Sequence, residues 1–171
     1  MKHLILIGLM GAGKTTVGKR CADRLDRSFV DTDDVVVSLA GMPVDEVFAR
    51  FGEPRFRELE RSAVGDVAAS PAPLVIACGG GTVLDPDNRA RLRASGVIVW
   101  LRAPVDVLTK RVGDGSTRPL LRGDPAAALT RLEKLREPAY EAAAHASVDT
   151  ADRDIDEVAA AVVDAYEKGS A

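Results

Sequence analysis

One short glycine-rich segment constrains the fold of this chain more than any other feature. Residues 8–15, Gly-Leu-Met-Gly-Ala-Gly-Lys-Thr, match the pattern G-x-x-x-x-G-K-[ST]. The apolar run Leu4–Ile7 precedes them and reads as a buried strand. After them, the spacing of Val17, Cys21 and Leu25 predicts an amphipathic helix. Because the pattern forms a phosphate-binding loop in this strand–loop–helix context, it predicts an α/β fold that binds a nucleoside triphosphate.

The residue types in this loop suit phosphate chemistry. Glycines let backbone N–H groups point at phosphate oxygens without Cβ clashes, and the following helix adds its positive N-terminal end. Lys14 is expected to bridge the β- and γ-phosphates, and the Thr15 hydroxyl to ligate Mg²⁺. The expected nucleotide contacts are Gly11, Ala12, Gly13, Lys14, Thr15 and Thr16.

Short apolar runs alternate with helical patterns along the rest of the chain. Near-continuous apolar strands separated by helices indicate a parallel sheet covered on both faces. The further expected strands are Phe29–Val30, Leu74–Ala77, Val97–Leu101 and, more weakly patterned, Ala146–Asp149. The helical stripes, all expected in the core, are Val44, Val47, Phe48 and Phe51, with Pro43 in the first turn; Phe56, Leu59, Ala63 and Val67; and Ile155, Val158, Ala159, Val162 and Tyr166, stopped by Gly169.

Length and charge narrow the class of protein. A chain of 171 residues predicts a single domain, 1–171. With 23 basic against 26 acidic residues and 4% aromatics, no nucleic-acid partner is expected. No apolar stretch is long enough for a membrane span, and no signal peptide is seen. Cys21 and Cys78 form no C-x-x-C pattern, which fits a reducing cytoplasm. His3 and His145 fall in no motif and are assigned structural or surface roles.

The sequence lacks the other signatures of a GTPase. No D-x-x-G occurs, and N-K-x-D is impossible because the only Asn, Asn88, is followed by Arg89. The apolar strand 74–78 ends in Gly79-Gly80-Gly81 instead of the Asp that commonly supports the metal. The supporting carboxylate must therefore come from another strand.

Two carboxylates follow the strand at Phe29 and could supply it. If the strand continues, Asp31 and Asp33 face the same side at its carboxyl end, where open α/β sheets bind ligands. One could hold Mg²⁺ through water, and the other could orient or deprotonate an acceptor hydroxyl. The alternative is a solvated acidic turn that caps the next helix, the role assigned to Asp34.

Two glycine-containing segments are further candidates. The turn at Gly79–Gly81 exposes backbone N–H groups and allows close approach of a ligand, with a plain flexible turn as the alternative. The stretch Gly113–Asp124 has no helical period, which indicates an exposed, mobile loop of the kind that carries function.

These motifs, taken in order, resemble the shikimate kinase family. The set comprises G-x-x-G-x-G-K-T, F-x-D-T-D, F-R-x-x-E, the G-G-G strand end, R-P-L-L and R-x-x-x-Y, and it covers nearly the whole chain. The resemblance implies a three-layer α/β/α fold with a five-stranded parallel sheet, a P-loop NTPase of the nucleoside-monophosphate-kinase type. It also implies a substrate-binding region at about 32–61, a mobile lid at about 112–124, and phosphorylation of shikimate by ATP with Mg²⁺.

The resemblance further implies roles for individual residues. Asp33 would contact the acceptor hydroxyls and is a candidate base, with Lys14 and Arg118 completing the catalytic set. Arg57 and Arg136 would grip the substrate carboxylate, a bidentate contact that fixes orientation as well as charge. The remaining implied contacts are the backbone of Gly79, Gly80 and Gly81 to a substrate hydroxyl, Asp31 to Mg²⁺ through water, Arg118 of the lid to the ATP phosphates, and Arg153 to adenine.

Two other functions compete with this interpretation. A related small-molecule kinase, such as one for gluconate, would share the phosphate loop but not the arginine pair with Asp31-Thr32-Asp33. A non-catalytic nucleotide-binding regulatory module would need no acceptor residues at all. The absence of long apolar surface helices or heptads favours a monomer.

Overall fold

The computed structural model describes residues 2–113, 119–121 and 123–171, and strands alternate with helices along it. The strands are β1 (His3–Ile7), β2 (Phe29–Asp31), β3 (Val75–Ala77), β4 (Gly96–Arg102) and β5 (Ala146–Asp149). The helices are α1 (Lys14–Leu25), α2 (Thr32–Ala40), α3 (Val44–Ala68), α4 (Pro86–Ser95), α5 (Val105–Val112), α6 (Pro125–Ala143) and α7 (Ile155–Ser170), with 3₁₀ turns η1 (Thr82–Leu84) and η2 (Pro119–Leu121).

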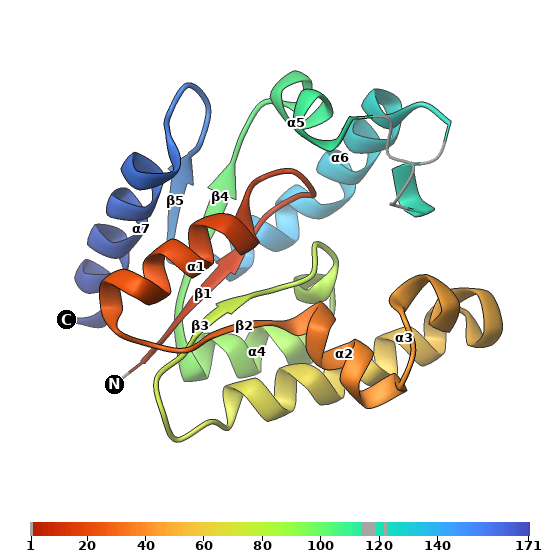
Figure 1. The fold of residues 1–171 in the computed structure, drawn as a ribbon, viewed down its shortest axis with the longest axis horizontal. Helices are drawn as coiled ribbons and strands as arrows, with labels where there is room; N and C mark the ends of the chain where they lie inside the picture. Colours follow the sequence, from red (N-terminus) through yellow and green to blue (C-terminus); the bar gives the residue numbers. More distant parts are fainter. Residues whose placement is uncertain (1, 114–118, 122) are drawn as a thin grey trace.

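The strands form one parallel sheet in the order β2-β3-β1-β4-β5 (Figure 1). In its central strand, Ile5 is registered with Ile76 of β3 on one side and with Ile98 of β4 on the other. Helices α1 and α7 pack together over one face, and α3, α4 and α6 lie on the other. The expected three-layer architecture with a five-stranded parallel sheet is therefore confirmed. All five strands end at the same edge, where the candidate residues follow them.

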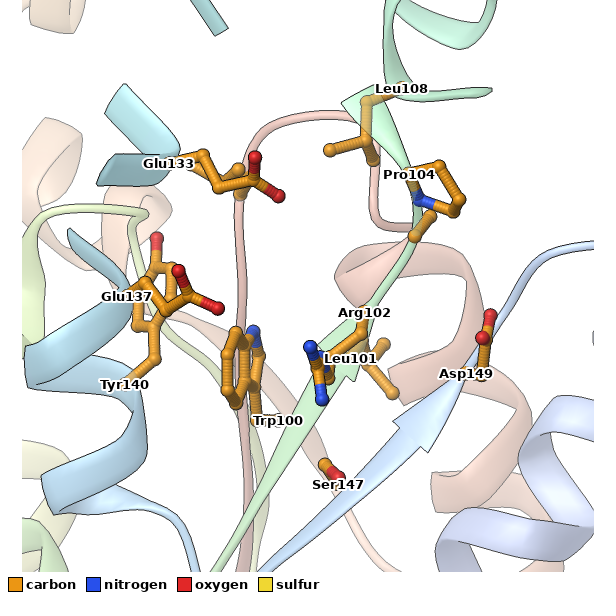
Figure 2. Close-up of a pocket in the computed structure, with 12 residues that line it drawn as sticks. Trp100, Leu101, Arg102, Pro104, Leu108, Glu133, Glu137, Tyr140, Ser147 and Asp149 are labelled. Carbon is orange, nitrogen blue, oxygen red and sulfur yellow. The ribbon is translucent and has the colours of Figure 1, made fainter. Parts of the chain in front are cut away.

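Helix α6 meets the sheet through aromatic contacts. Tyr140 of α6 and Trp100 of β4 make a tilted aromatic contact, with ring centroids 5.5 Å apart and an interplanar angle of 46°. Both rings line a cavity of about 440 Å³ between α6 and the ends of β4 and β5 (Figure 2). The other walls include Arg102, which lies over the Trp100 ring, and Glu137.

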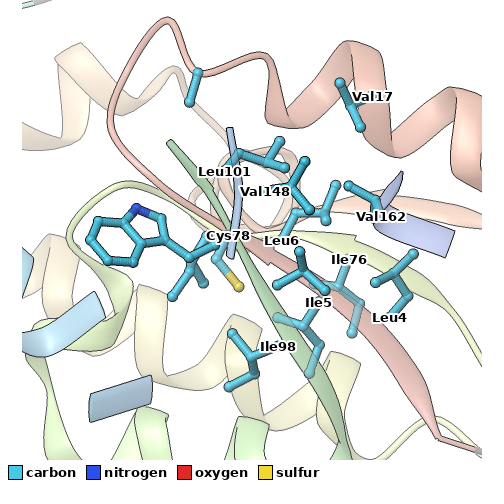
Figure 3. Packing of buried hydrophobic residues seen from close by; sticks show 14 of the residues in the cluster. Leu4, Ile5, Leu6, Val17, Ile76, Cys78, Ile98, Leu101, Val148 and Val162 are labelled. Carbon is cyan, nitrogen blue, oxygen red and sulfur yellow. The ribbon is translucent and has the colours of Figure 1, made fainter. Parts of the chain in front are cut away.

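The main core fills the space between the sheet and its helices. Leu4 and Leu6 are inaccessible to solvent and belong to the same hydrophobic cluster as Val162 of α7, and Ile98 contributes to this cluster from the other face of the sheet (Figure 3). The last four residues of the α7 stripe are buried as expected, but Ile155 is 49% exposed, because it begins the helix beside a surface loop. Helix α7 also continues to Ser170, so Gly169 does not stop it.

A smaller core lies beneath α2 and α3. Val36 of α2 packs there with Val47 and Phe56 of α3. Helix α3 is broken at Gly52, whose φ of 76° lies in the left-handed region. Phe51 precedes this break and is 56% exposed, so its expected burial is wrong. Pro43 lies at the N-cap, just before the first turn in which it was expected.

Both histidines hold neighbouring segments of the sheet through Nδ1. His3 accepts a hydrogen bond from the backbone N–H of Leu74 at 3.0 Å, and His145 accepts one from that of Ile98 at 3.0 Å. Desolvation lowers the pKa of each imidazole from its ordinary value. These contacts agree with the structural or surface roles assigned to the two histidines: His3 is buried and His145 is exposed.

The region expected to form a lid is described only in part. Leu121, in the 3₁₀ turn η2, is inaccessible to solvent and belongs to the main core, so the expectation of an exposed loop is wrong at this residue. Its neighbour Leu120 is 51% exposed. Across residues 2–113, 119–121 and 123–171, no helix combines the length and the apolar character needed to cross a bilayer.

Candidate active site

The glycine-rich loop joins the central strand β1 to α1, as its sequence predicts. Gly11 and Gly13 have φ values of 81° and 89°, a left-handed conformation that residues with a Cβ rarely adopt. Lys14 opens α1, and its Nζ donates to the carbonyls of Gly8 at 2.8 Å and Leu9 at 3.1 Å. The ammonium group therefore lies over the loop, beside the N-terminal end of α1. This arrangement is typical of a phosphate-binding site.

Two oxygen ligands suited to Mg²⁺ lie beside the loop. The Thr15 hydroxyl donates to Oδ2 of Asp31 at 2.9 Å, across the gap between α1 and the end of β2. Hydroxyl and carboxylate oxygens are hard ligands, and Mg²⁺ bound with a nucleotide commonly takes only one or two from the protein. The residues present therefore fit the cation that the sequence predicts here.

Asp31 has a second structural role that corrects two expectations. Strand β2 ends at Asp31 and α2 begins at Thr32, so alternation along a strand is not what brings Asp31 and Asp33 together. Instead, Oδ1 of Asp31 accepts from the backbone N–H of Asp33 at 3.0 Å and caps α2. Asp34 is therefore not the N-cap; it lies in the first turn of the helix.

The turn after β3, Gly79–Gly81, lies against three charged side chains. A Cβ on Gly79 would lie 2.8 Å from Oδ1 of Asp33, and one on Gly80 would lie 2.6 Å from Nη1 of Arg136. A Cβ on Gly81 would lie 2.9 Å from Nη1 and Nη2 of Arg57. Because each glycine lacks a Cβ, one charged side chain can lie close to its backbone. Any larger residue at these positions would prevent that approach.

The surroundings of Asp33 disfavour the ionised form of its carboxyl group. Displacement of water by the surrounding protein, together with the negative charges of Asp31 and Glu60, raises the pKa of Asp33 to about 6. The positive charge of Lys14 opposes this rise. A carboxylate whose pKa lies near neutrality is a better proton acceptor than an ordinary aspartate.

Glu60 is a site residue to which sequence reasoning assigned no role. Its side chain is 2% exposed. One carboxylate oxygen accepts from Arg57 Nη1 at 2.7 Å, and the other accepts from the Thr82 hydroxyl at 2.9 Å. Glu60 therefore holds the Arg57 guanidinium beside the glycine turn. The signal was present in the quoted F-R-x-x-E motif, because a glutamate three residues after an arginine lies on the same face of a helix.

Arg136 reaches the same turn from α6. The residue is only 3% exposed, and its Nε and Nη1 have no hydrogen-bond partner among the described residues. Buried, unpaired donors of this kind are costly unless a ligand satisfies them. The guanidinium is therefore suited to bind an anionic group that reaches the glycine turn.

Three further residues were predicted to contact the nucleotide: Thr16, Arg118 and Arg153. Thr16 is exposed in the first turn of α1. Arg153 is exposed, and its Nη1 donates to the Asp149 carbonyl at 3.4 Å. Arg118 lies outside the described residues. Arg111, which falls in none of the motifs, links the phosphate loop to the segment after β5: it donates to the Gly11 carbonyl at 3.3 Å and to the Thr150 hydroxyl at 2.9 Å.

The fold and the site together define a P-loop phosphotransferase. The phosphate loop is suited to bind a nucleotide, and the carboxylate and the two guanidinium groups are suited to bind a small, anionic acceptor with hydroxyl groups. A shikimate kinase family model matches residues 10–167. The chain belongs to the shikimate kinase family.

Individual relatives agree over the full length. A shikimate kinase of Caldanaerobacter subterraneus subsp. tengcongensis is 45% identical, with 98% of this chain and 98% of the relative covered. The solved structure of an Acinetobacter baumannii shikimate kinase in complex with shikimate has a TM-score of 0.93 at 32% identity, covering 99% of this chain and 94% of that one. A Sinorhizobium meliloti gluconokinase, at 24% identity and a TM-score of 0.67 with 98% and 92% coverage, shares the fold.

Proposed function

We propose that this chain transfers the γ-phosphoryl group of ATP to the 3-hydroxyl of shikimate, producing shikimate 3-phosphate and ADP for aromatic amino-acid biosynthesis. The observation that carries the proposal is the glycine turn, where Asp33, Arg136 and Arg57 each lie against a different glycine. Shikimate presents a carboxylate and neighbouring hydroxyls on one small ring, a pattern of charge that complements two guanidinium groups and one carboxylate.

The acceptor side orients shikimate and receives its proton. The substrate carboxylate binds between Arg57 and Arg136, and the hydroxyls reach Asp33 and the backbone of the glycine turn. Asp33 takes the proton of the 3-hydroxyl as the new bond to the γ-phosphorus forms. The bond from that phosphorus to the bridging oxygen breaks, and ADP leaves. Because the transition state is loose, positioning and charge neutralisation matter more than the strength of the base.

The nucleotide side neutralises the charge on the phosphates. Lys14 and the N–H groups of the loop bind the β- and γ-phosphate oxygens. Thr15 and Asp31 would hold Mg²⁺, with Asp31 acting through water, and the bound cation would supply further positive charge to those oxygens. Arg118 is expected to reach the phosphates, and Arg153 the adenine. The proposed setting is a monomer in the cytoplasm.

One coupled assay of ADP release tests the proposal against its rivals. The assay compares shikimate, gluconate and no acceptor, each with saturating Mg²⁺ and ATP. ADP release that depends on shikimate is the expected result. Release with gluconate alone would instead identify a gluconate kinase, and release with none of them would favour a non-catalytic nucleotide-binding module.

A further inference from the structure

Tyr140 is a buried polar residue to which no role has yet been assigned. It is 1% exposed, although its phenol carries a hydroxyl that needs a partner. That hydroxyl donates to the Gly80 carbonyl at 2.6 Å, across the gap between α6 and the turn that follows β3. The bond is short, and it joins segments that are 60 residues apart in the chain.

The position of Tyr140 on α6 links it to Arg136. The two residues are one helical turn apart, so both side chains leave the helix on the same face. Both reach the same residue: Tyr140 binds the Gly80 carbonyl, and Nη1 of Arg136 lies against the Gly80 Cα, where a Cβ would be only 2.6 Å away. A shift of the Gly80 peptide would therefore change the surroundings of the arginine.

The surroundings of Tyr140 fix its orientation and its protonation. The ring of Trp100 of β4 packs beside the Tyr140 ring in a tilted orientation (Figure 2). Burial raises the pKa of the Tyr140 phenol to about 12, although the nearby Arg136 charge opposes the rise. The hydroxyl therefore remains a hydrogen-bond donor throughout the physiological pH range.

We propose that Tyr140 is a positioning residue for the acceptor. Its hydroxyl fixes the Gly80 peptide, so that the backbone of residues 79–81 and the Arg136 guanidinium present a single preorganised surface. Without the hydroxyl, the Gly80 peptide can rotate towards solvent, and the acceptor must order the turn as it binds. The inference rests on the proposed acceptor site and adds a residue that does not itself touch the substrate.

The test compares Tyr140→Phe with a matched control, Tyr166→Phe. Tyr166 is 4% exposed, and its hydroxyl also donates to a backbone carbonyl, that of Lys2 at 2.8 Å, far from the carboxyl edge of the sheet. The same hydroxyl accepts a second hydrogen bond from Arg27 Nη1 at 2.8 Å, so the control removes at least as many contacts as Tyr140→Phe. Each variant therefore removes one buried hydroxyl and keeps the ring. Tyr140→Phe is expected to raise the KM for shikimate about three- to tenfold, the range expected for one lost hydrogen bond, with the KM for ATP unchanged. Tyr166→Phe is expected to leave both KM values unchanged.

Thermal unfolding and direct binding complete the comparison. A loss of melting temperature in Tyr140→Phe no larger than that in Tyr166→Phe, with a rise in the KM for shikimate in Tyr140→Phe alone, supports positioning. Shikimate titrations followed by the fluorescence of Trp100, the only tryptophan, should show the same loss of affinity. An unchanged affinity for shikimate in Tyr140→Phe, or an equal loss in Tyr166→Phe, overturns the inference.

Arg136→Lys separates this inference from the proposed acceptor site. If Arg136→Lys weakens shikimate binding and Tyr140→Phe does not, the acceptor site stands and the positioning role fails. If neither change affects shikimate binding while wild-type turnover still requires shikimate, the acceptor lies elsewhere and both assignments fail.

Discussion

The close contact between Gly80 and Arg136 predicts a large effect from a single methyl group. In Gly80→Ala the new Cβ would lie 2.6 Å from Nη1, whereas ordinary van der Waals contact begins at 3.4 Å. The guanidinium must therefore move by about 0.8 Å, the difference between these two distances. Because Arg136 is only 3% exposed, packed neighbours oppose that movement. The φ of Gly80 lies outside the left-handed region, so the backbone itself accepts alanine.

This displacement should mainly affect the acceptor. A misplacement of about 1 Å in a substrate-positioning group can cost roughly 100-fold in rate. We expect kcat/KM for shikimate to fall by about 10- to 100-fold, which corresponds to roughly 1.4 to 2.7 kcal/mol of lost transition-state stabilisation. The affinity for ATP should stay within about twofold of wild type, because the new Cβ would lie 3.6 Å from the Gly8 carbonyl of the phosphate loop, an ordinary van der Waals contact.

Coupled ADP release with varied shikimate measures this effect, and Gly65→Ala provides a matched control. The Cβ of that variant would also meet an arginine, Arg91 Nη1 at 3.3 Å, but Arg91 is exposed and can move away. The helical position of Gly65 should gain about 0.5 to 1 kcal/mol from alanine. If kcat/KM for shikimate is unchanged in Gly80→Ala, or falls equally in Gly65→Ala, the proposed contact with the acceptor is refuted.

Four further predictions concern charged or titratable groups of the site and of the sheet. Asp33→Asn should abolish most turnover in the coupled assay while retaining ATP binding; because its raised pKa of about 6 makes the ionised form costly, the variant should melt at a higher temperature at pH 7. In wild type, kcat/KM for shikimate should rise with pH through about 6, and a flat profile would contradict a role for ionised Asp33. Arg118→Ala should lower kcat more than ATP affinity in paired turnover and binding measurements; equal losses would indicate ground-state binding alone. Finally, His145→Gln should reduce the loss of melting temperature between pH 7.5 and 5.5. The folded-state pKa of His145 lies below its ordinary value of 6.5, so its contribution to stability is complete above that value and is lost as the pH falls; an unchanged acid slope would oppose this role.

The crowding of charge around the glycine turn has a cost in stability that its function explains. Asp33 and Glu60 raise each other's energy when both are ionised, and burial adds to the penalty on Asp33. Arg136 keeps two buried donors unpaired among the described residues. Such features destabilise a folded chain, and they persist where a substrate can compensate them.

Much of the fold could be predicted from local sequence. The strand–loop–helix unit around Lys14 follows from contiguous residues, because glycine conformations and helix periodicity are local properties. The strand at Ala146–Asp149 has the bounds that its pattern predicts. Burial depends on tertiary context, and two predictions of burial are wrong for this reason. The apolar stripes predict core positions for Phe51 and Ile155, but both residues lie at the end of a helical segment, where the chain turns away from the core.

The sequence by itself determined that this chain carries a phosphate loop, and, through its ordered motifs, which residues surround it. Only the tertiary structure decided how those residues meet. Strand β3 lies between β1 and β2, which brings the glycine turn beside Asp33 and places Asp31 within reach of Thr15. The contacts of Glu60 and Tyr140 could not be predicted, because the partner of a buried polar group depends on which segments pack together. Strand order and packing are non-local, and they convert a list of candidate residues into a site.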